Sequence, residues 1–234
     1  MLRLATWNVN SLKARLPRVE EWIDQVQPDV LCMQETKLAD GAFPDLTFRG
    51  LGYECAHHGE GRWNGVAILS KVGLDEVRAG WDDAAEPDPE ARQLWATCGG
   101  VRVATVYVPN GRSLDADHYT YKLGWLERLR TTLDAHEDPS GHVVVCGDFN
   151  IAPDDRDVYD PAAFQGETHV SPPERAALER SSSGASTTCS AATTTRPGST
   201  RGGTTAAATS TRAEACASTS CSPRRRSPLS PAPC

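Results

Sequence analysis

Asp148 and Asn150 stand two positions apart at the end of the apolar run 142–146. Such a run predicts a buried strand, and Gly147 lets the backbone turn so that both side chains project from the end of that strand. Strand ends of this kind hold the chemistry of many α/β proteins. Taken alone, Asp148 could equally be the N-cap of a following helix.

Three other apolar segments end in the same way. Asn8 ends a run near the N-terminus, Glu35 closes the run 29–33, and Tyr107 lies where the run 101–108 ends. Each residue alone has an ordinary interpretation, as a turn residue, a solvated strand end or a half-buried aromatic. Together they form a set of hard oxygen donors without thiolate or imidazole, which suits Mg²⁺ or Mn²⁺ better than zinc. The set therefore points to phosphate chemistry.

Five ordered blocks of sequence resemble the exodeoxyribonuclease III group, the bacterial apurinic/apyrimidinic endonucleases of the endonuclease/exonuclease/phosphatase superfamily. The resemblance covers roughly residues 1–180, and five blocks in order are far more specific than any single one. The blocks are MLRLATWNVNSL at 1–12, PDVLCMQETK at 28–37, WNGVAILS at 63–70, VYVPNG at 106–111 and GDFNIAP at 147–153.

This resemblance implies a fold and an activity. The fold would be an α/β four-layer sandwich of the DNase I-like type. The activity would be that of a Mg²⁺- or Mn²⁺-dependent DNA repair nuclease, which cuts double-stranded DNA at abasic sites and removes nucleotides from 3′ ends. A superfamily relative acting on a non-DNA phosphodiester or phosphate ester is the alternative within the enzyme class.

The resemblance also assigns roles to the five oxygen-bearing residues. Glu35 would be the direct metal carboxylate and Asn8 an amide of the metal shell. Asp148 would orient and deprotonate the attacking water, Asn150 would hold that water or a phosphoryl oxygen, and Tyr107 would hydrogen-bond the scissile phosphate. The expected metal-shell residues are Asn8, Glu35, Asp148 and Asn150, and the expected catalytic residues are Tyr107, Asp148 and Asn150.

The charge of the chain is unfavourable for a DNA-binding protein. The whole sequence has a net charge of −7, and residues 1–180 hold 18 Lys and Arg against 30 Asp and Glu. Such a surface repels a polyanion unless the binding groove is locally basic. The candidate phosphate contacts near the motif ends are Lys37, Arg62, Lys71, Arg112 and Lys122.

The remaining pattern predicts alternating helices and strands. Apolar residues at helical spacing predict one helix over 16–26, with Pro17 in its first turn, and another over 123–133, capped by Asp115 or Asp117. Strands are expected at 52–57, 63–70 and 94–98. The sequence shows no signal peptide or membrane-spanning run, so we expect a cytoplasmic monomer with reduced cysteines in its core.

Residues 181–234 differ from everything before them. They contain 12 Ser, 11 Thr and 10 Ala among 54 residues and no aromatic side chain, so we expect a disordered tail. A flexible linker or a mucin-like stalk is one interpretation. Rewritten as degenerate codons and shifted by two bases, however, the stretch is compatible with LYTWWDYR, GDFH and GLRID, words that resemble the second part of the same family. We therefore interpret it as out-of-frame translation, arising in the gene or in its sequencing.

This interpretation has a functional consequence. The family pattern needs an Asp from an RID word and an Asp-His pair from an SDH word, and the sequence contains neither. We expect domain 1–180 to be an incomplete nuclease domain that lacks its second sheet and is inactive. The competing hypothesis is a non-catalytic, poorly folded fragment that binds metal or DNA weakly at most.

Overall fold

Apolar runs in the N-terminal third of the chain form a four-stranded sheet, here called the first sheet. The computed structural model describes residues 2–81, 83, 88–136, 141–182, 192–193 and 211–212. In spatial order the first sheet consists of β1 (Leu4–Asn8), β2 (Val30–Gln34), β4 (Val66–Ser70) and β3 (Glu54–His58). Strands β1 and β2 are parallel and are connected by helix α1 (Leu12–Val26), whereas β4 runs antiparallel to both of its neighbours.

The second sheet repeats this plan with the next part of the chain. In spatial order it consists of β5 (Asp75–Ala79), β6 (Gln93–Cys98), β7 (Val101–Tyr107) and β8 (Val143–Asp148). Strands β7 and β8 are parallel and are connected by helix α3 (Asp117–His136), and the other pairings are antiparallel. Each sheet thus contains one parallel β-α-β unit, and the carboxyl ends of its two parallel strands lie at the same edge.

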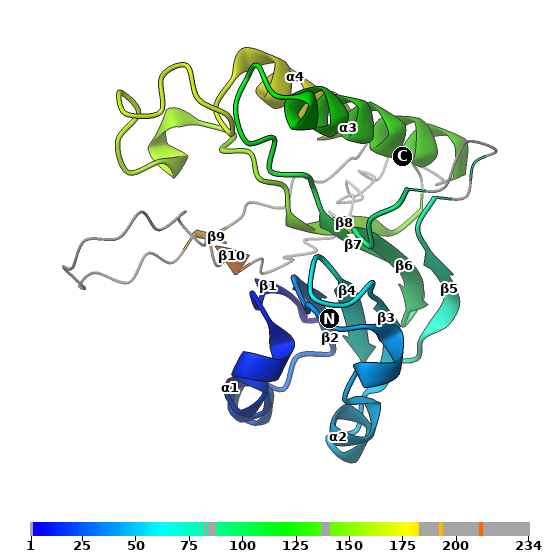
Figure 1. Ribbon diagram of the computed structural model, residues 1–234. Helices are drawn as coiled ribbons and strands as arrows, with labels where there is room; N and C mark the ends of the chain where they lie inside the picture. The colour runs from blue at the N-terminus through cyan, green and yellow to red at the C-terminus, as the bar shows by residue number, and fades with distance from the viewer. Residues whose placement is uncertain are drawn as a thin grey trace, which may run out of the picture.

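The two sheets pack face to face between two layers of helices (Figure 1). Residues from both sheets form the central core, among them Ile68 of β4 and Val103 of β7. Helices α1 and α2 (Asp45–Gly50) cover the outer face of the first sheet, and α3 and α4 (Pro172–Ser182) cover the outer face of the second. The predicted four-layer α/β sandwich is confirmed.

The expectation that the second sheet is missing was wrong. All four of its strands come from residues 75–148, before the change in composition, and they cover the inner face of the first sheet. The facing sheet was expected from the second part of the chain, although the apolar runs at 94–98 and 101–108 already supply its centre. The inner faces therefore bury each other's apolar side chains and form the central core.

Short elements complete the described chain. The 3₁₀ turns η1 (Asp40–Ala42) and η2 (Asp155–Asp157) lie in loops, and the two-residue strands β9 (Ala192–Thr193) and β10 (Thr211–Arg212) pair with each other. Helix α4 extends two residues beyond position 180. Strands β9 and β10 also lie in the region 181–234 that was expected to be disordered, and the rest of that prediction concerns positions outside the described residues.

Helix α1 begins earlier than its apolar spacing predicted. Backbone N–H groups of Ser11 and Leu12 donate to the carbonyls of Glu35 (2.7 Å) and Thr36 (2.9 Å), so the start of the helix is tied to the end of β2. Pro17 consequently lies inside the helix rather than in its first turn. Helix α3 begins at Asp117, one of the two expected caps, while α2, α4 and β5 were not predicted.

Gly147 is required by close strand packing at the site edge. Its φ is +142°, and a Cβ there would lie 2.0 Å from the carbonyl oxygen of Val106 on the neighbouring β7. The strand nevertheless continues through Gly147 to Asp148, whose register partner is Tyr107. Glycine at this position lets β8 deliver Asp148 beside Tyr107 without pushing the two strands apart.

No helix in the described part of the chain is long and apolar enough to cross a membrane.

Candidate active site

Asn8 connects the two sheets at one edge of the sandwich. Its side-chain Nδ2 donates to Glu35 Oε1 and to Asp148 Oδ2, each at 2.7 Å. Glu35 follows β2 in the first sheet, whereas Asp148 ends β8 in the second, and the Asn8–Asp148 contact spans 140 positions of sequence. One amide therefore joins the two carboxylates that the sequence placed at separate strand ends.

Asp148 is the more deeply buried of the two carboxylates. Burial raises its pKa, and the negative charge of Glu35 acts in the same direction. Hydrogen bonds from Asn8 and from the backbone N–H of Asn150 (3.0 Å to Oδ1) partly oppose this rise. A carboxylate with a raised pKa is a better proton acceptor, which is the property that a general base needs.

Glu35 has the opposite tendency. Burial alone would raise its pKa, but hydrogen bonds from Asn8 and Lys37 and the positive charge of Lys37 lower it overall. Lys37 Nζ lies 2.9 Å from Glu35 Oε2 and 2.5 Å from Asn10 Oδ1. Glu35 has a left-handed backbone (φ +53°), which directs the chain into the loop that carries Lys37. This carboxylate stays ionised, as a cation ligand must.

Tyr107 ends β7 opposite Asp148 and lies under a cation. Burial raises the pKa of its phenol, and the carboxylates of Glu35 and Asp148 add to this effect. The Arg92 guanidinium lies 4.7 Å from the Tyr107 ring centroid, and Arg92 Nη1 donates to the Tyr107 carbonyl at 3.1 Å. Tyr107 is therefore a neutral hydrogen-bond donor held in a fixed ring orientation.

Asn150 lies two residues beyond Asp148 with a left-handed backbone (φ +49°). Its side-chain Nδ2 donates to the Val108 carbonyl at 2.9 Å, so its side chain is tied to the end of β7. The structure thus brings Asn8, Glu35 and Asp148 into direct contact, and it attaches Asn150 and Tyr107 to Asp148 through hydrogen bonding and strand register.

A buried glutamine fixes the distance between the two sheets below this edge. Gln34, which is 1% exposed, donates from Nε2 to Thr6 Oγ1 in the first sheet and to Thr105 Oγ1 in the second, both at 2.9 Å. Gln34 directly precedes Glu35. Sequence reasoning missed this role, because nothing in a single strand shows that its polar residue faces another sheet.

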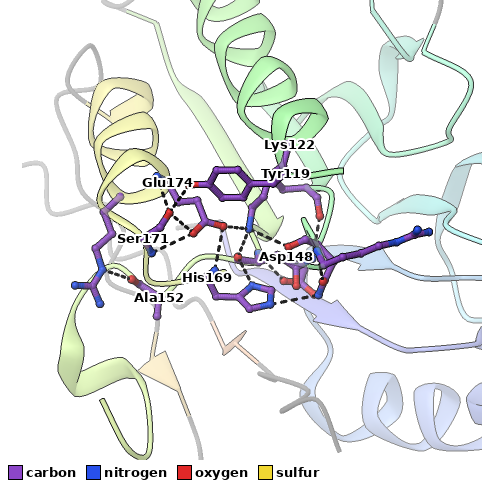
Figure 2. A network of polar contacts seen from close by, with 12 residues as sticks. Tyr119, Lys122, Asp148, Ala152, His169, Ser171 and Glu174 are labelled. Atoms are coloured by element: carbon purple, nitrogen blue, oxygen red, sulfur yellow. Dashed lines mark hydrogen bonds and ion pairs between the residues drawn. The ribbon is translucent and has the colours of Figure 1, made fainter. Parts of the chain in front are cut away.

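Sequence reasoning also missed a buried polar network behind Asn150 (Figure 2). Lys122, His169 and Glu174 lie there together with Ser171, and no motif in the sequence surrounds the histidine. The one available signal was Ser171-Pro-Pro-Glu174, the spacing of a helix capping box. That signal predicts the start of α4 and gives no hint of contact with the site.

The five candidate phosphate contacts lie in different environments. Lys37 and Arg112 lie beside the site, since Arg112 N–H donates to Asn110 Oδ1 at 3.1 Å, and Arg62 stacks on exposed Trp63. Two assignments were wrong. Lys71 lies at the opposite end of the first sheet, where its N–H donates to the Asp29 carbonyl, and Lys122 is fully buried.

The donor set fits a hard divalent cation in chemistry. Two carboxylates from different sheets point toward one amide nitrogen, and the oxygen of the same Asn8 amide accepts from the Asn10 N–H at 3.0 Å. Within the described residues, no three His, Cys, Asp or Glu side chains gather as a metal-binding group. A cation at this edge would therefore rely on two carboxylates with Asn8 and Asn150, an oxygen-only set typical of Mg²⁺ rather than zinc.

Comparisons with known proteins show the family of this chain. The family model described as "Endonuclease/Exonuclease/phosphatase family" matches residues 5–213. Exodeoxyribonuclease III of Haemophilus influenzae is 33% identical over 162 residues, which cover 67% of this chain and 60% of that protein. The chain thus spans about three fifths of the length of that relative.

Solved structures show the same fold. An AP endonuclease from Archaeoglobus fulgidus superposes with a TM-score of 0.75 at 39% identity. The match covers 77% of this chain and 70% of the endonuclease chain. A 3′ phosphatase from Neisseria, bound to a product DNA hairpin, superposes with a TM-score of 0.74 at 35% identity, covering 79% and 71%. This chain belongs to the exonuclease III/AP endonuclease family of the endonuclease/exonuclease/phosphatase superfamily.

Proposed function

We propose that this chain carries the metal-holding and water-activating part of a Mg²⁺- or Mn²⁺-dependent DNA repair nuclease, which cuts abasic sites and 3′ ends of double-stranded DNA. The observation that carries the proposal is the Asn8 amide between Glu35 and Asp148. This amide places Glu35, whose pKa is lowered, beside Asp148, whose pKa is raised. Two carboxylates with pKa values shifted in opposite directions can divide cation binding and proton transfer between them.

Each residue then has a specific task. Glu35 and Asn8 would hold the cation, which supplies charge neutralisation at the phosphate when it is bound. Asp148 would accept the proton of the attacking water, and Asn150 would hold that water or a phosphoryl oxygen. Tyr107 would donate its phenolic hydrogen bond to the scissile phosphate, as its neutral form allows.

We further propose that the chain as it stands is inactive. The sequence has no RID or SDH word, from which the family resemblance expects the remaining Asp and the Asp-His pair. His169 does not replace that histidine, because both of its ring nitrogens already lie against protein groups. Negative charge over residues 1–180 adds a general repulsion of DNA. The cytoplasmic location and the monomeric state remain predictions.

The test combines cleavage with metal binding. Incision of a duplex with one abasic site is measured with Mg²⁺ and with EDTA, and Mn²⁺ affinity is measured by electron paramagnetic resonance, for the chain, its Glu35→Gln variant and a frame-restored version. We expect Mn²⁺ binding that Glu35→Gln abolishes, cleavage by the frame-restored version alone, and its loss in EDTA.

Three outcomes would contradict the proposal. Cleavage by the 234-residue chain that survives EDTA would exclude the metal-dependent site. Absence of Mn²⁺ binding in a chain whose circular dichroism shows a folded α/β domain would support the non-catalytic fragment instead. Cleavage of a non-DNA phosphodiester with no action on abasic DNA would favour the superfamily alternative.

A further inference from the structure

Lys122 of α3 is completely buried behind the site (Figure 2). Its Nζ contacts three oxygens: the backbone carbonyls of Asn150 (2.6 Å) and Asn110 (3.3 Å), and Glu174 Oε1 (2.5 Å). A buried ammonium group is costly unless its three N–H donors all find acceptors, and here each has one. Two of the three acceptors are backbone atoms of loops at the site.

Glu174, in the first turn of α4, is the negative partner of Lys122. Besides Lys122 it accepts hydrogen bonds from the His169 N–H at 3.0 Å and from the N–H (3.1 Å) and hydroxyl of Ser171. Burial alone would raise its pKa, but the hydrogen bonds from Lys122 and Ser171 lower it overall. The ion pair is thus fully satisfied, and its position is fixed by two helices on the outer face of the second sheet.

The carbonyl held by Lys122 belongs to a residue with a left-handed backbone. Asn150 has φ +49°, a value that asparagine adopts more readily than most other residues except glycine. Its carbonyl also lies 2.5 Å from His169 Nδ1, and its own N–H donates to Asp148 Oδ1 at 3.0 Å. The carbonyl and the N–H of Asn150 belong to the two peptide groups that meet at its Cα, so contacts that fix the carbonyl also restrain the backbone that presents the N–H to Asp148.

His169 links the same two loops from the other side. A carbonyl only accepts hydrogen bonds, so Nδ1 must carry the proton in its contact with Asn150. Nε2 is then free to accept from the Asn110 side-chain amide, 3.3 Å away. The geometry therefore requires the Nδ1–H tautomer of a neutral ring.

We propose that Lys122, Glu174 and His169 are positioning residues that hold the Asn110 and Asn150 loops and, through the Asn150 backbone, orient the Asp148 carboxylate. Lys122 acts as an internal support and does not bind phosphate. The catalytic part of this inference rests on the proposed function. The mechanical part, a rigid Asn150 loop, does not.

The experiment separates positioning from simple stability. Lys122→Met removes the three donors and leaves the Glu174 carboxylate buried without its cation, so it is expected to destabilise the fold strongly. The double variant Lys122→Met/Glu174→Gln has neither charge, and it should recover most of the lost stability. If Lys122 only stabilised the fold, the site of this double variant would match that of the parent chain. If Lys122 positions the loop, the site would be altered, because the Asn150 carbonyl still lacks its donor.

The readout is ¹⁵N relaxation of the Asn150 amide together with the ¹⁵N shifts of the His169 ring. In the parent chain we expect an order parameter of about 0.85, as in rigid backbone, and the Nδ1–H tautomer. In the double variant we expect an order parameter below about 0.6 and a mixture of tautomers, with the amides of β7 unchanged. Tyr119→Phe is the matched control. It removes the hydroxyl contact with Ser171 at the far end of the network and should alter neither signal.

A rigid Asn150 amide in the folded double variant would overturn the proposal. Where the parent or its frame-restored version cuts DNA, kcat should fall at least tenfold in the double variant while KM changes less than twofold, and an unchanged kcat would refute the catalytic part. If the parent does not cut DNA, the relaxation measurement alone decides the positioning role. Failure of the proposed nuclease function is therefore distinguished from failure of the positioning role.

Discussion

The first and second sheets deliver one carboxylate each to the same edge, but they surround it differently. Glu35 of the first sheet lies beside Lys37 and has a lowered pKa, whereas Asp148 of the second sheet is buried beside Glu35 and has a raised pKa. The two parallel β-α-β units are alike in topology. Similar topology therefore places the groups, and the neighbouring side chains decide what each group does.

The sheets also differ in what supports their site residues from behind. The loop after β2 is held by backbone contacts with α1 and by a lysine at its surface. The loop after β8 is held by a buried ion pair from α3 and α4. The ion pair that supports the Asp148 side is thus fully buried, whereas the one beside Glu35 is partly exposed to solvent.

The largest expected effects come from the outer helical layers. Ile23→Ala on α1 and Leu129→Ala on α3 each empty a fully buried position and should each lower the free energy of unfolding by roughly 3 to 4 kcal/mol. Because the central core joins the two sheets, each variant should still unfold in a single cooperative urea transition. A variant in which one sheet unfolds in a separate transition from the other would show that the sheets unfold independently.

A buried histidine should make the first sheet sensitive to acid. His57 of β3 is 5% exposed in its side chain, and burial lowers its pKa from 6.5 to about 4, against the effect of Asp40. Between these values the unfolded chain binds the proton more readily. The stabilisation is therefore complete above pH 6.5 and is lost as pH falls toward 4, by up to roughly 3 kcal/mol.

Urea unfolding followed from pH 7 to pH 4 tests this slope. His57→Gln should flatten it, and His58→Gln, the adjacent histidine, serves as the control. His57 Nδ1 lies 3.0 Å from Asp40 Oδ1 without hydrogen-bond geometry, and Nε2 contacts Thr36 Oγ1 at 2.8 Å. An unchanged slope in His57→Gln would mean that another group controls the acid response.

The two site carboxylates should affect stability with opposite sign at neutral pH. Glu35→Gln removes the ionised partner of Lys37 and should lower the free energy of unfolding by about 1 kcal/mol. Asp148→Asn removes a buried carboxylate whose raised pKa makes its charge unfavourable, so the same quantity should rise. Thermal unfolding at pH 7 measures both. Equal losses in the two variants would remove the proposed division between cation ligand and proton acceptor.

The smallest expected effect concerns the alignment of the sheets. Thr105→Val and Thr6→Val each remove one hydrogen bond of Gln34, at a cost of about 1 kcal/mol. Only Thr105 belongs to the second sheet, so Thr105→Val alone should weaken Mn²⁺ binding, by about threefold to fivefold. Equal Mn²⁺ affinities in the two variants would show that Gln34 does not set the separation of the carboxylates.

The sequence by itself determined the strand ends and the donor types. The apolar runs before Glu35, Tyr107 and Asp148 predicted buried strands, because runs of this length cannot remain solvated, and the resemblance predicted the sandwich. The sequence did not determine which strands pair with each other. The order of apolar runs does not show which run lies beside which, and the second sheet was therefore wrongly expected to be missing.

Only the tertiary structure decided how the groups act on one another. Asn8 reaches Asp148 across 140 positions, and Lys122 meets Glu174 across 52. Neither contact can be recognised from hydrophobic periodicity or from neighbouring residues, since the sequence does not distinguish a buried lysine from an exposed one. Burial and charge partners depend on which surfaces meet, and these set the pKa of each carboxylate and the support behind Asn150.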